Sequence, residues 1–305
     1  MKPKLVIVLG PTAVGKSELA LELGQRFHGE IVNADSQQVY RYMDIGTGKP
    51  SRGDRERVPH HVIDLVDPDQ EFNAALFRRS AAQAIEEIHR CGKNIVVCGG
   101  TGLYLKALTR GLFTGPGPDP EIRRALEEVI HQDGLAKLYQ RLVAIDASVT
   151  SSIHPNDRQR IIRALEIFEI TGRPLSAWQK EHSFKEEPFE VVMLGLMRER
   201  AELYDRINRR SERMIQEGLP EEVRDLVTRG FGLDLKPLRS VGYRQMGAVI
   251  RGELDLTQAL EKMKQETRRL AKRQLTWFRQ DGEIRWYHPE EQKEDIFQAV
   301  AEFLL

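Results

Sequence analysis

Short apolar runs and helical spacing alternate along the first hundred residues of the chain. The apolar runs predict strands at Lys4–Leu9, Glu30–Ala34, His61–Leu65 and Asn94–Cys98. Between them, Glu18–Leu23 and Phe72–Arg90 carry apolar residues at the intervals of an amphipathic helix. Strands that alternate with helices are typical of an α/β fold, in which a parallel sheet is flanked by helices on both faces. Ligands of such sheets bind at the carboxyl ends of the strands.

The stretch 111–120 interrupts this alternation, because its glycines and prolines favour an exposed linker. Beyond it the spacing predicts helices over 120–132, 134–144 and 157–171, and a buried strand over Val191–Leu196. We therefore expect residues 1–112 and 189–305 to form the α/β core, and 113–188 to form an all-helical insertion domain. The rest of the core is expected to hold helices over 200–217, 219–229, 240–251, 256–280 and 290–305, and a short strand over 283–287.

Composition is that of an ordinary globular protein, with 40% hydrophobic and 30% charged residues among 305. No apolar run is long enough to cross a bilayer and no signal-peptide pattern is present, so we expect a cytoplasmic protein with no membrane partner. Cys91 and Cys98 form no CxxC motif, and we expect two buried thiols rather than a disulfide or metal site. The 46 basic and 46 acidic residues balance, so a nucleic acid would have to be held by local basic patches.

The most specific motif follows the first strand and consists of Gly10, Pro11, Thr12, Ala13, Val14, Gly15, Lys16 and Ser17. It fits the phosphate-loop pattern and lies between a predicted strand and a predicted helix, where that loop belongs. The backbone amides and the helix N-terminus favour an anion, while Lys16 can reach outer phosphates and the Ser17 hydroxyl suits a magnesium ion. A glycine-rich turn with a surface lysine is the less favoured interpretation. We predict a di- or triphosphate site in a P-loop NTPase-like sheet.

Asp35 ends the second predicted strand and should face Lys16 and Ser17 across the crevice. A carboxylate there can accept a proton or ligate magnesium, although Asp also favours a capping role. The strand 94–98, in contrast, is followed by Gly99-Gly100-Thr101 and lacks the acid that holds the metal in ATP hydrolases. This absence argues against an ATPase, although small-molecule kinases can also lack the acid.

Basic residues gather at three places. Arg206 and Arg210 lie four residues apart, so they share a helix face and could clamp phosphate oxygens. The segment 264–279 holds six basic residues and a single acid, Glu266, and a further basic cluster lies at 158–163 in the insertion. Each cluster could be a solvated helix face, but two basic surfaces that flank one phosphate site indicate a groove for a polynucleotide.

An ordered set of motifs along essentially the whole chain resembles the bacterial tRNA dimethylallyltransferases, also called tRNA isopentenyltransferases. The segments are GPTAVGKS (10–17), NADSQQVYRYMDIGTGKP (33–50), GGTGLYLKAL (99–108), DPEIR (119–123), HPNDRQRIIRALEI (154–167), VGYRQM (241–246) and TRRLAKRQLTWFR (267–279). Many families share the phosphate loop, whereas the ordered set is highly specific.

The resemblance implies transfer of a dimethylallyl group from dimethylallyl diphosphate to the exocyclic amine of adenosine 37 of tRNA, which is 3′-adjacent to the anticodon. By position, Asp35 would be the general base, Thr101 would lie near the reacting amine, and Arg210 would stabilise charge on the leaving diphosphate together with Thr12, Lys16, Ser17 and Mg²⁺. A leaving diphosphate needs no acid for water activation, which agrees with the sequence after the strand 94–98.

Contacts to the tRNA anticodon stem-loop follow from the same resemblance, and they place the insertion 113–188 against the RNA. The implied residues are Asp35, Ser36, Gln37, Gln38, Thr101, Arg123, Gln159, Arg160, Ile161, Ile162, Arg163, Ser240, Val241, Gly242, Tyr243, Arg244 and Gln245. The basic segment 264–279 adds Arg268 and Lys272 as backbone contacts. We expect a monomer.

Two other functions fit part of the sequence. A small-molecule kinase that uses ATP would explain the phosphate loop and Asp35 but not the two basic surfaces. A non-catalytic RNA-binding module would leave the phosphate loop unexplained.

Overall fold

The computed structural model describes residues 2–113, 115–182 and 186–305. Met1, Thr114 and residues 183–185, which belong to the expected core, linker and insertion, lie outside the described residues. The chain divides into two compact units. Met1–Thr109 with Glu187–Leu305 form one, called here the α/β unit, and Arg110–Glu186 form the other, called the helical unit.

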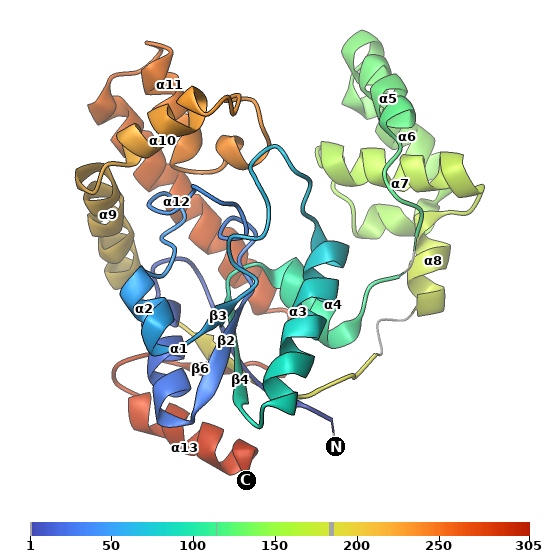
Figure 1. Ribbon diagram of the computed structural model, residues 1–305. Coiled ribbons are helices and arrows are strands. Elements are labelled where there is room, and N and C mark those ends of the chain that lie inside the picture. The colour runs from blue at the N-terminus through green and yellow to red at the C-terminus, as the bar shows by residue number, and fades with distance from the viewer. Residues whose placement is uncertain (1, 114, 183–185) are drawn as a thin grey trace. The chain divides into compact units, whose positions relative to one another are not determined.

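A parallel sheet forms the centre of the α/β unit, as the alternation of strands and helices predicts (Figure 1). Within the described chain its strands, in spatial order, are β3 (His60–His61), β2 (Gly29–Asn33), β4 (Asn94–Gly99), β1 (Lys4–Leu9), β5 (Glu190–Leu196) and β6 (Arg285–Tyr287). Because β1, β2 and β4 are parallel neighbours, the loops after them meet at one edge of the sheet. These loops are 10–17, 35–38 and 100–101.

Helices outside the insertion complete the α/β unit, some on the two faces of the sheet and others, at 219–228 and 243–250, packed against neighbouring helices. They are α1 (Lys16–Arg26), α2 (Arg52–Arg57), α3 (Ala74–Arg90), α4 (Gly102–Arg110), α9 (Arg200–Gln216), α10 (Leu219–Thr228), α11 (Tyr243–Ile250), α12 (Leu256–Phe278) and α13 (Lys293–Leu304). Alternate residues of β1 face opposite cores, as the two-residue period of a strand requires. Leu5 and Ile7 share a core with α3 and α4, whereas Val6 and Val8 share one with α1, α9 and α13.

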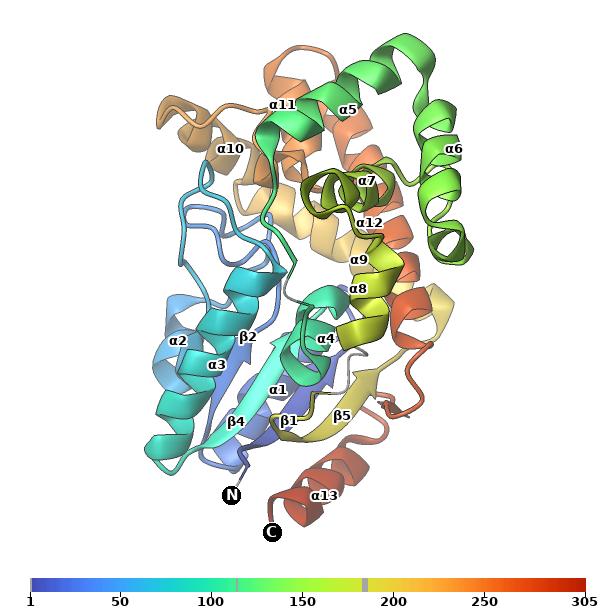
Figure 2. The ribbon, with the colours of Figure 1, turned by 90° about the vertical axis from the view of Figure 1, so that its right-hand side faces the viewer.

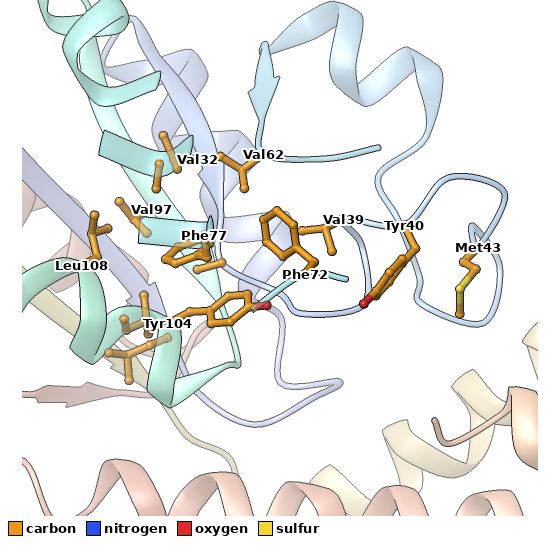
Figure 3. Packing of buried hydrophobic residues seen from close by; sticks show 14 of the residues in the cluster. Val32, Val39, Tyr40, Met43, Val62, Phe72, Phe77, Val97, Tyr104 and Leu108 are labelled. Atoms are coloured by element: carbon orange, nitrogen blue, oxygen red, sulfur yellow. The ribbon is translucent and has the colours of Figure 1, made fainter. Parts of the chain in front are cut away.

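Aromatic packing fixes the segments next to the carboxyl edge (Figure 3). Phe77 of α3 stacks on Tyr104 of α4 with ring centroids 4.3 Å apart, and Phe72 meets Tyr104 edge-on. Both rings of the stacked pair are buried, and such pairs stabilise a core by about 1 kcal/mol beyond the burial of their area. The start of α4, directly after Thr101, is therefore held firmly.

The helical unit consists of α5 (Pro120–Asp133), α6 (Leu135–Ile145), α7 (Arg158–Thr171) and α8 (Leu175–His182) (Figure 2). Its own apolar core includes Leu126, Leu138 and Leu165. Asp119 starts α5 by accepting hydrogen bonds from two backbone N–H groups, and Pro120 occupies the first turn, where no intrahelical donor is lost. The unit thus has the helices that the spacing after residue 120 predicts.

Several expected elements differ from the structure. The strand expected over His61–Leu65 is wrong beyond its first residue, because Val62 and Asp64 have φ of 60° and 53°, a left-handed backbone that a strand does not contain. The helix expected from Ser240 starts at Tyr243, after Gly242 with φ of 97°. The sequence pattern does not predict the short helices α2, α4 and α8.

The structure also tests the expectations that both cysteines are buried and that no segment crosses a membrane. Cys98 is buried, but Cys91 is exposed at the end of α3, so the expectation of two buried thiols is wrong for Cys91. Among the described residues, every helix is too short or too polar to cross a bilayer.

Candidate active site

The loop 10–17 wraps between the end of β1 and the start of α1. Gly10 has φ of 142°, and a Cβ there would lie 2.7 Å from the Leu196 carbonyl oxygen, so only glycine fits. Gly15 has φ of 112° and precedes the first turn of α1, whose free N–H groups favour an anion. The backbone therefore has the shape that the phosphate-loop motif predicts.

Lys16 is held at the floor of this loop. Its Nζ donates a hydrogen bond to the Pro11 carbonyl oxygen at 2.7 Å. Burial lowers the pKa of Lys16 to about 8, and the carboxylate of Asp35 opposes that shift. A lysine with this pKa is close to losing its charge in mildly alkaline solution, and a bound anion would restore it.

A cavity of about 680 Å³ opens beside Lys16 and Ser17. Among the described residues, cations dominate its lining: Lys16, Lys49, Arg52, Arg55, Arg206, Arg209, Arg210 and Arg213 stand against Glu18, Asp44 and Glu217. Asp64 and Asp205, outside the lining, pair with Lys49, Arg55 and Arg209, and the positive charge that remains, at Lys16 and Arg210 above all, suits a polyanion such as a diphosphate. The sequence pattern predicts a role for Lys16, Arg206 and Arg210. It predicts none for Lys49, although Lys49 lies in the motif segment 33–50, and none for Arg52 or Arg55, which reach the cavity through folding of the segment 44–55.

Arginines of α9 tie this helix to the phosphate loop and to the loop 44–55. Nε of Arg206 donates to the Ala13 carbonyl oxygen at 2.9 Å. Arg210 contacts Gly48 so closely that a Cβ at that position would overlap its guanidinium. Burial lowers the pKa of Arg210, and the nearby Asp35 carboxylate opposes the shift. Arg210 therefore lies within the electrostatic reach of both Asp35 and the phosphate loop.

Asp35 and Thr101 meet at the carboxyl edge of the sheet. Asp35 Oδ1 accepts a hydrogen bond from the backbone N–H of Gln37 at 2.8 Å, and Ser36 N–H donates to Thr101 Oγ1 at 3.0 Å. Thr101 N–H in turn donates to the Ala34 carbonyl oxygen at 3.3 Å. These bonds join the loop after β2 to the loop after β4. Asp35 also lies within electrostatic reach of Lys16, although neither Asp35 nor Thr101 is among the described residues that line the cavity.

No acid follows β4, and the part of the chain that the structure describes holds no cluster of three or more His, Cys, Asp or Glu suited to a metal. The site therefore lacks the carboxylate that places a metal for nucleotide hydrolysis.

Residues expected to contact RNA in the α/β unit differ in accessibility. Gln38 is buried and donates to the carbonyl oxygens of Thr47 and Gly48. Tyr243 is fully buried, with its hydroxyl donating to Glu222 at 2.6 Å. Arg244 is exposed and pairs with Glu266. In the segment 240–245, a side-chain contact to a partner thus falls most readily to Arg244.

Helix α12 presents a basic face to solvent, formed by Arg269, Lys272 and Arg273. Arg268 does not belong to it, because its Nη1 donates to Asn208 Oδ1 at 2.7 Å and its guanidinium lies 5.8 Å from the centre of the Tyr204 ring on α9. The expectation that Arg268 and Lys272 contact the tRNA backbone therefore concerns one partly buried side chain held by Asn208 and one exposed side chain.

In the helical unit, Gln159 and Arg160 are exposed, whereas Ile161 and Ile162 pack in the apolar core. The buried Glu166 accepts from Arg123 Nε at 2.7 Å and also pairs with Arg163. These bonds lower the pKa of Glu166 against the opposing effect of burial, so it remains ionised. Arg123 and Arg163 thus have a structural partner, and Ile161 and Ile162 offer no exposed side chain.

Comparison with known proteins agrees with this geometry. The family described as IPP transferase matches residues 38–281. A tRNA dimethylallyltransferase of Geobacter metallireducens is 53% identical over 302 residues, which cover 99% of this chain and 98% of that protein.

Solved structures give the same result. A tRNA isopentenylpyrophosphate transferase of Bacillus halodurans is 39% identical with a TM-score of 0.73, and the match covers 99% of this chain and 97% of that one. A eukaryotic dimethylallyltransferase acting on tRNA is 28% identical with a TM-score of 0.84, over 99% of this chain and 79% of that one. The chain belongs to the IPP transferase family, that of the tRNA dimethylallyltransferases.

Proposed function

We propose that this protein transfers the dimethylallyl group of dimethylallyl diphosphate to the exocyclic amine of adenosine 37 in tRNA. Family membership supports this reaction. The observation that carries it here is a cation-lined cavity at the phosphate loop, whose Lys16 and Arg210 interact electrostatically with Asp35, and the absence of a water-activating acid directly after β4. Such a site can accept a departing diphosphate without hydrolysing it.

The chemical step joins the adenine nitrogen to the allylic carbon of the donor. The carbon–oxygen bond to diphosphate breaks and its electron pair leaves with the diphosphate, while the amine loses one proton. Adenine's amine is a weak nucleophile, so the barrier depends on charge stabilisation of the leaving group and on alignment.

Lys16 and Arg210 are proposed to stabilise the leaving diphosphate. Both line the cavity, and Arg210 stays protonated throughout the physiological range. Thr12 lies on the same loop and would add a hydroxyl donor. Cations in a partly buried site stabilise a developing negative charge more strongly than cations in water do, because the surrounding dielectric is lower.

Asp35 is proposed to accept the proton from the amine, with Thr101 beside it as a hydrogen-bonding neighbour. The backbone N–H groups of Gln37 and Ser36 donate to Asp35 and Thr101 respectively, and these two bonds hold the two side chains in place. The carboxylate lies within electrostatic reach of Lys16 and Arg210, so in this proposal the base and the cations that stabilise the leaving group act in one site.

Mg²⁺ fits this site if it is held by the Ser17 hydroxyl and by diphosphate oxygens of the substrate, without a cluster of acidic side chains. Ser17 lines the cavity and would hold the ion through its hydroxyl, because magnesium commonly keeps few protein ligands and takes the rest from phosphate and water. When bound, the ion supplies further positive charge to the diphosphate oxygens.

The anticodon stem-loop is proposed to contact both units. The exposed candidates are Gln159 and Arg160 of the helical unit, and Arg244 with the basic face of α12 in the α/β unit. The target base must leave its stack to reach Asp35, which costs a few kcal/mol that contacts around the loop offset.

Replacement of Asp35 tests the assignment of the base. Asp35→Ala is expected to abolish transfer in a single-turnover assay with radiolabelled dimethylallyl diphosphate, while tRNA affinity measured by filter binding stays within about threefold of wild type, since the carboxylate acts on the proton and not on the RNA backbone. Normal single-turnover chemistry together with weakened tRNA binding would refute the assignment.

A further inference from the structure

Gln274 of α12 lies between the phosphate loop and the loop that carries Thr101. Its side-chain oxygen Oε1 accepts a hydrogen bond from Thr12 N–H at 2.9 Å. Its amide nitrogen Nε2 donates to the Gly100 carbonyl oxygen at 3.0 Å. One side chain therefore binds backbone groups of the two loops that hold the two ends of the proposed reaction.

On the diphosphate side, the bond from Gln274 acts on Lys16 through a single peptide group. The peptide between Pro11 and Thr12 donates its N–H to Gln274 and accepts the Lys16 ammonium at its carbonyl oxygen, 2.7 Å away. Because a peptide group is planar, fixing the direction of its N–H fixes the direction of its carbonyl. Gln274 thus orients the group to which Lys16 is bonded.

On the acceptor side, the bond acts on Thr101 in the same way. The peptide between Gly100 and Thr101 accepts Gln274 at its carbonyl oxygen and donates its N–H to the Ala34 carbonyl oxygen. Thr101 Oγ1 accepts from Ser36, the residue after Asp35. Gln274 therefore also orients the peptide that places Thr101.

Close packing around residue 274 and the need for both a donor and an acceptor leave few side chains that could replace Gln274. A Cβ on Gly100 would lie 2.5 Å from Gln274 Nε2, and a Cβ on Gly102 would overlap the indole of Trp277 one turn along α12. The two bonds need a donor and an acceptor at the end of one side chain. Gln provides both at this reach, whereas Glu has no donor when ionised, Lys has no acceptor and Asn is one carbon shorter.

We propose that Gln274 is a positioning residue that sets the distance between the leaving diphosphate and the acceptor amine. The inference rests on the proposed prenyl transfer. We call the two hydrogen bonds of the Gln274 side chain the Gln274 clasp. A displacement in which one bond forms as another breaks is sensitive to alignment of the reacting groups. Loss of this clasp should therefore slow the chemical step more than it weakens binding of either substrate. Gln274 need not touch either substrate to have this effect.

Gln274→Met tests the clasp, because methionine has a similar length and volume without a strong donor or acceptor. We expect kcat to fall by about tenfold to about a hundredfold, with KM for dimethylallyl diphosphate and for tRNA each within about threefold of wild type. The matched control is Gln298→Met on α13, an exposed glutamine that bonds only to Glu302 in the described structure, which should leave kcat and both KM values unchanged. Thermal unfolding of the two variants shows whether either is less stably folded.

A double-substitution cycle gives an independent test. Gly100→Ala should slow single-turnover transfer because its methyl group displaces the Gln274 amide, and Gln274→Ala should slow it by removing that amide. If both substitutions act through the Gln274 clasp, Gly100→Ala should slow single-turnover transfer by less than about threefold in the Gln274→Ala background. In that background the nearest remaining atom, the Gly10 carbonyl oxygen, is 3.5 Å from the new methyl group.

The outcomes separate this inference from the proposed function. Wild-type protein that transfers no label to tRNA contradicts the proposed function and, with it, this inference. Active wild-type protein with a Gln274→Met variant of kcat within about twofold overturns the positioning role alone. A fall in kcat that simply follows a fall in the amount of folded protein, or fully additive effects in the cycle, also overturns it.

Discussion

Lys16 determines how the candidate diphosphate site responds to pH. Its ammonium is buried at the base of the phosphate loop, bonded to the Pro11 carbonyl oxygen, and has a pKa of about 8. Burial favours the neutral amine, whereas a bound diphosphate favours the charged form. The charge of this one residue is therefore available to an incoming anion at neutral pH and disappears as pH rises.

The pH dependence of kcat/KM for dimethylallyl diphosphate follows from this pKa. Below about pH 8 Lys16 of the free enzyme is protonated, and above it kcat/KM should fall, approaching about tenfold for each pH unit. Lys16→Arg keeps its charge at all these pH values, so its profile should lack the alkaline fall even if its rate is lower throughout. An unchanged alkaline fall in Lys16→Arg would show that another group titrates.

The residues of the candidate site are brought together in two ways, by strand order in one sheet and by tertiary hydrogen bonds. Only the first can be predicted from the sequence. Lys16, Asp35 and Thr101 each follow a strand of one parallel sheet, so strand prediction alone indicates that they meet. Lys49 and Gln274 come from a loop and a distant helix, and their places depend on tertiary bonds. Glu222 of α10, for instance, accepts three consecutive backbone N–H groups of residues 44–46 and so fixes the loop that carries Lys49.

At the scale of elements, apolar periodicity predicts the long helices and the buried strands, because burial of one face dominates their stability. It fails for short elements that depend on local capping or backbone strain. Helix α2, for example, has no buried residue and is held by a capping box between Ser51 and Asp54. The direction of Arg268, in turn, could not be predicted because it is set by Asn208 of α9.

The exposed face of α12 is expected to bind the phosphate backbone of tRNA. Arg269→Ala combined with Lys272→Ala should weaken tRNA binding and reduce the slope of log affinity against log salt by about one for each phosphate that these side chains neutralise. KM for dimethylallyl diphosphate should not change. Lys93→Ala, an exposed cation at the opposite edge of the sheet, is the matched control. A salt slope equal to that of the control would remove this face from the interface.

At the scale of the whole molecule, the two compact units divide the candidate residues by chemistry. Every residue proposed to touch the diphosphate or the reacting amine belongs to the α/β unit, whereas Gln159 and Arg160 belong to the helical unit. Since the net charge of the chain is zero, neither substrate is attracted by a general field. Recognition of the RNA and of the donor should therefore be separable by substitution.

Arg160→Ala tests this separation. It should raise KM for tRNA by about fivefold to about tenfold, as expected when one charge-assisted hydrogen bond to the RNA is removed, and leave KM for dimethylallyl diphosphate unchanged. Lys137→Ala on α6, an exposed cation of the same unit that pairs with Asp133, serves as the control and should change neither KM. Equal tRNA kinetics for the two variants would contradict a role of the segment 159–163 in RNA binding.

The central claim is that the cavity at the phosphate loop holds a departing diphosphate rather than a nucleotide whose phosphoryl group is passed on. In the most direct measurement, the protein is incubated with unmodified tRNA and one of two labelled donors. The donors are dimethylallyl diphosphate labelled in the prenyl group and ATP labelled in its terminal phosphate, and the label is then located in the products. The account predicts prenyl label in tRNA at adenosine 37 and no transfer of phosphate. Phosphate transferred from ATP to an acceptor, with tRNA left unlabelled by the prenyl donor, would contradict it.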